Sequence, residues 1–430
     1  MLICVFTGAS SGLPLFLLLQ LVPAWLRSES VDLKAIGLLT LVQLPYTWKF
    51  LWSPLIDRYA PPLLGRRRGW MLAMQVGLLA AIAGFGGVSP AGLAAPDFAR
   101  HEIAGWSLWL PDWAATLAFI GHPVTVVALA TALFSATQDI ALDAFRRELL
   151  RDEELGLGNS IHITAYRAAG LVPGALSLIL ADHLPWSAVF VCTALFMLPG
   201  MAMTLLSAEP QRTSEPPRTL RAAAIEPFRE FIGRAGWRHA AWLLGFMFFY
   251  KLGDSLCTAL ATPFYLDLGF SKTEIGVVAK NAGLWGSIGG GLLGGVWMLR
   301  LGITRALWVF GAVQMLSILG FAWLAASGTV DAGGALFKLG FVVGFEAFGV
   351  GVGTAAFVAF IATQTHPAYT ATQLALFTSF MAVPRTLVNA SAGYLVDALG
   401  WTQFYLLCFA LALPGMLMLL KVAPWRPRSV

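Results

Sequence analysis

Charged side chains are scarce in this sequence. Asp, Glu, Lys and Arg make up 12% of its 430 residues, whereas 58% of the residues are hydrophobic. A soluble domain has about 25% charged residues. So little charge cannot cover the apolar side chains in water, which argues against a soluble globular protein and indicates a membrane protein.

Cysteine and histidine are also few. The six histidines are dispersed, so an integral membrane enzyme with a clustered nucleophile, metal or acid and base is disfavoured. We therefore expect neither enzymatic activity nor a cofactor. We also expect no metal site and no disulfide, because the four cysteines are scattered through apolar stretches at Cys4, Cys192, Cys257 and Cys408.

The alternation of a membrane β-barrel is absent, and long apolar stretches recur instead. A stretch of about 20 apolar residues crosses a bilayer as a helix, and only helices or closed barrels satisfy the backbone in lipid. The sequence predicts an all-α membrane protein with twelve transmembrane helices. The expected spans are 2–24, 35–56, 69–88, 117–142, 159–181, 186–207, 240–262, 275–299, 304–326, 336–361, 371–395 and 401–421.

The cations are distributed unevenly about these spans. Of 28 Lys and Arg, 18 lie on the face shared by the even-numbered loops and the C-terminus, 5 lie on the other face and 5 lie inside spans. The positive-inside rule then predicts that both termini are cytoplasmic. This topology explains the net charge of +5 without a nucleic-acid partner. No basic segment precedes the first span, so we expect a retained helix rather than a cleaved signal peptide.

The chain also contains a repeat. Asp182, Trp186 and Pro199-Gly200 match Asp397, Trp401 and Pro414-Gly415 at an offset of 215 residues. A proline-rich and arginine-rich stretch lies between the two halves. This pattern resembles the major facilitator architecture, in which two halves rock around a midplane substrate site. We expect an N-terminal six-helix bundle at 1–207, a cytoplasmic linker at 208–238 and a C-terminal six-helix bundle at 239–430.

A charged motif follows span 2. Asp57-Arg58 and then Gly65-Arg66-Arg67-Arg68-Gly69 resemble the Gly-x-Leu-Ala-Asp-Arg-x-Gly-Arg-Arg loop of major facilitators. Pairing of Asp57 with the arginines would fasten one gate conformation. The predicted cytoplasmic gate is therefore Asp57, Arg58, Arg66 and Arg67; the alternative is that the arginines only anchor the positive-inside topology.

Ionisable residues inside membrane spans are costly and usually functional. Their helical spacing with polar and aromatic neighbours predicts a cavity for a large, polar, acidic solute. Internal pairing of Lys251 with Asp254 and snorkelling of Lys49 remain alternatives. The predicted substrate-binding residues are Gln43, Tyr46, Lys49, Gln138, Arg167, Tyr250, Lys251, Asp254, Lys280, Asn281, Glu346, Arg385 and Asn389.

Two carboxylates on span 4 are candidates for proton coupling. Asp139 and Asp143 lie four residues apart and share a helix face. Burial and a second carboxylate both favour a neutral acid, which can then take up and release a proton. The alternative is that Asp143 pairs with Arg146 or Arg147, which leaves Asp139 as the coupling residue.

Glycines cluster on spans 8 and 10. They run from Gly289 to Gly295 and from Gly344 to Gly353. We expect close helix packing. A nucleotide loop is excluded because no strand precedes the run and no Gly-Lys-Ser/Thr ending follows it. Small residues around Glu346 would also leave room for a bulky ligand.

Several strings resemble the AmpG family of muropeptide permeases, across essentially all twelve spans. In the first half they are Ser11-Gly12-Leu13-Pro14-Leu15, Asp32-Leu33-Lys34, Lys49-Phe50-Leu51-Trp52-Ser53-Pro54-Leu55 and Gln138-Asp139-Ile140 with Asp143-Ala144. In the second half they are Tyr250-Lys251-Leu252-Gly253-Asp254, Gly353-Thr354 and Thr372-Gln373. The resemblance adds Gln373 to the expected binding residues and places the family's span-4 carboxylate on Asp139.

The resemblance implies a function. It implies proton-driven import of N-acetylglucosaminyl-1,6-anhydro-N-acetylmuramic acid and its peptides across the bacterial inner membrane, for cell-wall recycling. It also implies a link to β-lactamase induction, and we expect a monomer in the lipid bilayer. The alternative is a major facilitator for another large anion, such as an acyl-coenzyme A. The long aromatic loop at 89–116 and the end of the chain after twelve spans depart from some members.

Overall fold

The computed structural model describes residues 2–59, 61, 64–103, 106–150, 155–209, 220–327, 334–364, 377 and 380–425. Gln373 lies outside the described residues. The side chains of Asp57 and Arg58 do so as well, although their backbone belongs to a described helix.

The predicted helical membrane architecture is confirmed. Within the described residues, ten stretches are long and apolar enough to cross a membrane. They are Leu2–Ser28, Arg66–Gly87, Pro123–Arg146, Ile161–Ala181, Trp186–Leu206, Gly236–Asp267, Lys272–Leu301, Ile303–Ala326, Ala335–Ile361 and Phe380–Val422.

The ten stretches and the twelve expected spans differ for two physical reasons. Phe380–Val422 covers much of span 11 and all of span 12, because helix α20 continues through a bend at Gly400, where φ is 75°. Span 2 is broken into short helical pieces that each fall below the length of a span. Prolines at Pro45 and Pro54 begin two of these pieces, since proline suits the first turn of a helix and disrupts its interior.

The chain divides into two compact units. Unit 1 comprises Met1–Thr213 and Ala390–Asp397, and unit 2 comprises Ser214–Asn389 and Ala398–Val430. The main division therefore falls inside the expected linker. Within unit 1, Lys34 Nζ lies 2.9 Å from Asp397 Oδ2.

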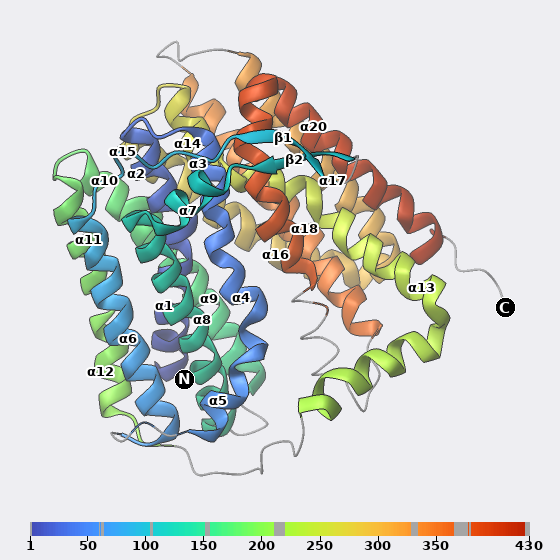
Figure 1. Ribbon diagram of the computed structural model, residues 1–430. Coiled ribbons are helices and arrows are strands. Elements are labelled where there is room, and N and C mark those ends of the chain that lie inside the picture. Colours follow the sequence, from blue (N-terminus) through green and yellow to red (C-terminus); the bar gives the residue numbers. More distant parts are fainter. Residues whose placement is uncertain are drawn as a thin grey trace. The chain divides into compact units, whose positions relative to one another are not determined.

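Unit 1 is built from helices that run side by side (Figure 1). Helix α1 packs against α8, α9 and α12, and α6 packs against α8, α11 and α12. The elements before the long loop are α1 (Leu2–Phe16), η1 (Leu17–Leu21), α2 (Val22–Ser28), α3 (Leu33–Leu39), η2 (Thr40–Gln43), α4 (Leu44–Trp48), η3 (Lys49–Leu51), α5 (Ser53–Arg58), α6 (Arg66–Gly84) and η4 (Phe85–Gly87). Those after it are α7 (Trp113–Gly121), α8 (Pro123–Leu149), α9 (Leu155–Ala169), η5 (Val172–Leu176), α10 (Ser177–Ala181), α11 (Trp186–Leu195) and α12 (Leu198–Leu206).

The long loop between α6 and α8 has structure that the sequence did not predict. Strands β1 (Phe98–Ile103) and β2 (Trp106–Pro111) form an antiparallel hairpin that pairs Phe98 with Pro111. Helix α7 follows, and its end separates it from α8 because His122 is extended and Pro123 starts the next helix. The expected start of span 4 at residue 117 is therefore wrong; the membrane helix begins at Pro123.

Unit 2 begins with a helix that runs through the second part of the expected linker. Helix α13 bends at Gly236, where φ is 78°, and the bend is visible in Figure 1. Only the part after this bend is a membrane span. From here on the elements are α13 (Leu220–Ala259), α14 (Ala261–Asp267), α15 (Lys272–Glu274), η6 (Ile275–Ala279), α16 (Lys280–Leu301), α17 (Ile303–Ala326), α18 (Ala335–Thr363), η8 (Pro384–Val388), η9 (Asn389–Ser391) and α20 (Ala392–Val422). Of these, the segment Ala390–Asp397, in η9 and the start of α20, belongs to unit 1.

The glycines of α16 bring its backbone against α18. A Cβ on Gly290 would meet the carbonyl oxygen of Phe348, and one on Gly294 would lie 3.0 Å from Val352 Cα. On the facing helix, a Cβ on Gly351 would lie 2.7 Å from the carbonyl oxygen of Ser287. The geometry agrees with the expectation of close helix packing at these positions.

Candidate functional site

Unit 1 brings the candidate coupling carboxylate together with an intramembrane cation. The Ser11 hydroxyl donates to Asp139 Oδ1 at 2.6 Å, and Lys49 Nζ lies 3.8 Å from Asp139 Oδ2. The three side chains come from α1, α8 and η3, and α8 packs against both of the other two. The Asp139 side chain is 15% exposed and that of Lys49 is 34% exposed. This arrangement holds one carboxylate between a hydroxyl and a loosely paired ammonium group.

The second carboxylate of span 4 has a different environment. Asp143 Oδ1 accepts from Arg146 Nη2 at 2.9 Å, and the Asp143 side chain is 54% exposed. This is the alternative arrangement that the sequence left open. An exposed carboxylate that pairs with its own helix neighbour is poorly suited to carry a proton through the membrane.

Two amides of unit 1 have buried polar atoms without a hydrogen-bond partner among the described residues. Gln138, next to Asp139, is fully buried, and neither its Oε1 nor its Nε2 has a hydrogen-bond partner in the described structure. Gln43 on η2 is 2% exposed, and its Oε1 also has none. Buried polar atoms are normally hydrogen-bonded, so these amides are suited to a polar ligand or to water. Of the other predicted residues in this unit, Tyr46 and Arg167 are half-buried.

A separate hollow on unit 1 is apolar. Its volume is about 340 Å³, and it is lined by Leu44, Pro45, Trp48, Trp52, Leu129 and Leu133. Such a lining suits an acyl chain of the surrounding lipid rather than a polar solute.

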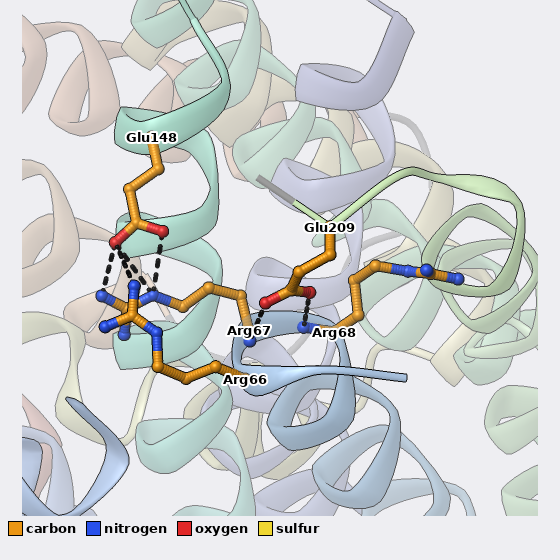
Figure 2. A network of polar contacts seen from close by, with 5 residues as sticks. All are labelled: Arg66, Arg67, Arg68, Glu148 and Glu209. Atoms are coloured by element: carbon orange, nitrogen blue, oxygen red, sulfur yellow. Dashed lines mark hydrogen bonds and ion pairs between the residues drawn. The ribbon is translucent and has the colours of Figure 1, made fainter. Parts of the chain in front are cut away.

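The predicted gate residues Arg66 and Arg67 both pair with Glu148, which the sequence did not predict. Arg67 Nη2 donates to Glu148 Oε1 at 2.6 Å, and Arg66 Nη2 donates to the same atom at 2.9 Å (Figure 2). The Arg67 side chain is 5% exposed. Burial alone would raise the pKa of Glu148, but the hydrogen bonds and charges of the two arginines lower it below its usual value. Glu148 therefore joins the start of α6 to the C-terminal end of α8.

A second carboxylate extends this network. Glu209 accepts from the backbone N–H of Arg67 at 2.7 Å and of Arg68 at 3.0 Å, so it caps the first turn of α6 (Figure 2). The Arg68 guanidinium donates to the carbonyl oxygens of Thr204 and Leu205 at the end of α12. The role of Asp57 and Arg58 in a gate stays a prediction, since their side chains lie outside the described residues.

Unit 2 contains a polar cluster around one lysine. Lys251 Nζ donates to Thr354 Oγ1 at 2.8 Å, to Asp254 Oδ2 at 3.2 Å and to Gln314 Oε1 at 3.4 Å. The pairing of Lys251 with Asp254 is the alternative that the sequence left open. Asp254 and Glu346 are 8% and 5% exposed, and each has one carboxylate oxygen without a hydrogen-bond partner in the described structure.

Two predicted binding residues of unit 2 make structural contacts instead. Tyr250 is 4% exposed in the hydrophobic core, stacks on Phe357 and donates to the carbonyl oxygen of Leu307 at 3.1 Å. Asn281 donates to the carbonyl oxygens of Gly276 and Val277 in the preceding turn. In this conformation neither polar group is directed toward a solute.

The other predicted residues of unit 2 lie at or next to irregular turns. Lys280 directly follows the π-helical turn η6 and donates to Thr262 Oγ1 at 2.7 Å. Arg385 lies within the π-helical turn η8, and Asn389 follows it and accepts from Ser255 Oγ at 3.3 Å. Single π-turns within helices are frequent at functional sites, because they re-aim side chains.

The sequence did not indicate Ser11, Glu148 or Glu209 as functional residues. Ser11 was visible only within a family string, and a small hydroxyl carries no signal of its partner 128 residues away. The only signal for Glu148 in the sequence was that it is an acidic residue near the arginines of the predicted cytoplasmic face. The sequence contains several such acids, and their spacing does not say which one is buried.

Comparison with known protein families shows to which family the chain is related. Residues 3–388 match the model of the Major Facilitator Superfamily. The chain is 50% identical to a Haemophilus influenzae protein, over 100% of this chain and 96% of that protein. It is 41% identical to the anhydromuropeptide permease of Escherichia coli (strain K12), over 97% of this chain and 78% of the permease.

Solved structures show the same fold at low sequence identity. A D-xylose-proton symporter has a TM-score of 0.68 at 13% identity and covers 98% of this chain and 97% of its own. The nucleoside transporter NupG has a TM-score of 0.68 at 12% identity, and the match covers 97% of this chain and 99% of NupG. The chain is therefore a transporter with the major facilitator fold, and it belongs to the Major Facilitator Superfamily and, within it, to the AmpG family.

Proposed function

We propose that this protein imports anhydro-muropeptides, the disaccharide N-acetylglucosaminyl-1,6-anhydro-N-acetylmuramic acid and its peptides, across a bacterial inner membrane. The observation that carries the proposal is the relationship to the E. coli anhydromuropeptide permease along nearly the whole chain. The transport direction is from periplasm to cytoplasm, and both termini are cytoplasmic. The proposal extends to cell-wall recycling and, through the imported fragments, to β-lactamase induction.

The polar groups of unit 1 support a solute of this chemistry. Such a solute carries hydroxyl and acetamide groups on its sugars and carboxylates on its peptide. The buried amides of Gln43 and Gln138 have hydrogen-bonding capacity that the described protein does not use. Amide side chains can both donate to and accept from hydroxyl and acetamide groups. Lys49 Nζ lies 3.8 Å from Asp139 Oδ2, which is long for an ion pair, so Lys49 can also bind a carboxylate of the solute.

We assign proton coupling to Asp139, within an alternating-access cycle driven by the proton gradient. The carboxylate is the only acid paired with Lys49 in the described part of the chain. When Asp139 takes up a proton, Lys49 loses its counter-charge and becomes available to a carboxylate of the solute. When the solute leaves, Lys49 again stabilises the ionised Asp139. Proton binding and solute binding therefore favour one another through one ammonium group.

Transport of another large anion, such as an acyl-coenzyme A, is the competing function. A phosphate-rich anion would also be attracted by the intramembrane cations. The two functions differ in which unlabelled compound competes for the site.

A counterflow experiment separates them. Proteoliposomes preloaded with unlabelled anhydro-muropeptide should take up the labelled compound, and external unlabelled anhydro-muropeptide should reduce this uptake. Acyl-coenzyme A should not reduce it. The proposal fails if labelled anhydro-muropeptide enters no faster than into protein-free liposomes, or if only the acyl-coenzyme A competes.

A further inference from the structure

Glu346 lies deep in the membrane-spanning part of α18. The apolar stretch Ala335–Ile361 contains it near its centre, since a rise of about 1.5 Å per residue places it roughly 16 Å from one end and 22 Å from the other. The residue is 5% exposed. Its Oε1 is buried without a hydrogen-bond partner in the described structure. An ionised carboxylate at such a position is strongly disfavoured unless a cation balances it.

Among the described residues, one cation acts on Glu346. Lys251 is the nearby positive group, and it is already engaged by Asp254, whose Oδ2 lies 3.2 Å from Lys251 Nζ. The ionisable side chains that interact electrostatically with Glu346 are Lys251, Asp254 and Cys257 of α13, Tyr265 of α14 and Tyr405 of α20. Cysteine and tyrosine are neutral near pH 7 in the absence of a strong perturbation. The cluster therefore has two carboxylates and one ammonium group.

In the described structure, the next turn of α18 packs against uncharged side chains. Gly349, one turn further along α18, faces α17 at Gln314 and Ser317, which are uncharged. Gln314 Oε1 already accepts from Lys251. The charge of the cluster is balanced if one of the two carboxylates is neutral, and Asp254 is the one that contacts the ammonium group.

We propose that Glu346 binds a proton, so that unit 2 holds a proton-binding site of its own in addition to Asp139 of unit 1. Glu346 carries the proton while Lys251 and Asp254 remain an ion pair. Loss of the proton leaves the cluster with one uncompensated negative charge inside the membrane. A place for this proton in the transport cycle rests on the proposed function, whereas the bound proton itself is measured without transport.

Infrared spectroscopy of the purified full-length protein in an ester-free detergent tests the proposal, because only a protonated carboxyl group has the C=O stretch of a carboxylic acid. At neutral pH, the difference spectrum between wild type and Glu346→Gln should contain one such band. The matched control is Glu29→Gln, which removes an exposed carboxylate and should leave this region unchanged.

Two further variants should change the number of protons bound by the cluster without altering Glu346. In Asp254→Asn, Lys251 has only Glu346 to balance it, so the acid band should disappear although Glu346 is present. In Lys251→Met, no cation remains, so both carboxylates should be protonated and the band should roughly double. A cluster in which Glu346 and Asp254 are both ionised has no acid band for Asp254→Asn to remove, and these variants keep the test decisive if Glu346→Gln does not fold.

The outcomes that overturn the proposal are specific. They are an acid band that is the same in wild type and Glu346→Gln, or a band that Asp254→Asn leaves unchanged. An ionised Glu346 together with a melting temperature that rises with sodium would show a metal cation in place of the proton, and would also overturn it. Absence of anhydro-muropeptide transport would leave these spectra unaffected, so the two proposals fail separately.

Discussion

At the scale of single residues, a substitution of Asp139 tests the proposed proton coupling most directly. Substitution Asp139→Asn keeps the size of the side chain and removes its charge. A pH difference of one unit supports about tenfold accumulation per coupled proton. We expect wild type to approach this ratio and Asp139→Asn to fall to about one, while exchange of labelled for unlabelled solute continues.

The measurement is uptake into vesicles with and without the gradient, with Glu29→Gln as the control. Undiminished gradient-driven accumulation in Asp139→Asn would refute the assignment of coupling to Asp139.

A second residue-scale prediction concerns Glu148. Its substitution by Gln leaves the buried Arg67 guanidinium without its counter-charge, and we expect a loss of about 2 to 3 kcal/mol in the free energy of unfolding. The folded pKa of Glu148 lies below its usual value of 4.5, so its contribution is present above that pH and is lost as the pH falls through the folded pKa.

Thermal unfolding in detergent should therefore show that acidification below pH 4.5 destabilises wild type more than Glu148→Gln. Equal acid sensitivity of the two proteins would show that the network in Figure 2 does not stabilise unit 1.

The residue scale also shows what a sequence can and cannot predict about a site. The costly intramembrane charges identified Lys49, Asp139, Lys251 and Asp254, and the structure places each of them in a polar contact. Partners that are small or common, such as Ser11 and Glu148, had no signal because their contacts depend on helix packing. Tyr250 fitted a polar stripe by spacing, yet the fold places its ring in the core.

At the scale of elements, the contact between α16 and α18 depends on which glycines face the partner helix. Gly289 and Gly290 are neighbours, but a Cβ on Gly289 would meet nothing within 4 Å, whereas one on Gly290 would clash with the backbone of α18. We expect Gly290→Ala to reduce the free energy of unfolding by about 1 to 3 kcal/mol. Gly289→Ala should be neutral or stabilise by up to about 1 kcal/mol, because alanine favours helix.

Melting temperatures of the two variants in one detergent check this prediction. An equal effect of both substitutions would show that the two helices do not approach as closely as the structure places them.

The sequence predicted the existence of the membrane helices better than their breaks and the structure of their connections. Apolar length located the membrane helices because lipid leaves the backbone few alternatives. It did not reveal the breaks in span 2, the hairpin of β1 and β2, or the helix from Leu220 within the expected linker. Those features depend on proline positions and local backbone pairing, which hydropathy does not measure.

At the scale of the whole molecule, the uneven distribution of cations predicts the orientation in the membrane. The test uses single cysteines at Glu29→Cys and Lys421→Cys, two exposed positions, each at the C-terminal end of its span, that the expected topology places on opposite faces of the membrane. In intact cells an impermeant maleimide should label the first and not the second, and in inverted vesicles the pattern should reverse. Wild type, with its four native cysteines, provides the background. Labelling of Lys421→Cys in intact cells would contradict cytoplasmic termini.

The central claim for the whole molecule is gradient-driven import of anhydro-muropeptide, and vesicle uptake under a defined pH difference tests it most directly. With the outside one pH unit more acidic, vesicles that contain the protein should accumulate labelled anhydro-muropeptide about tenfold per coupled proton, and a protonophore should abolish the accumulation. Uptake no greater than in vesicles without the protein, or accumulation that is the same with and without the gradient, would contradict the account.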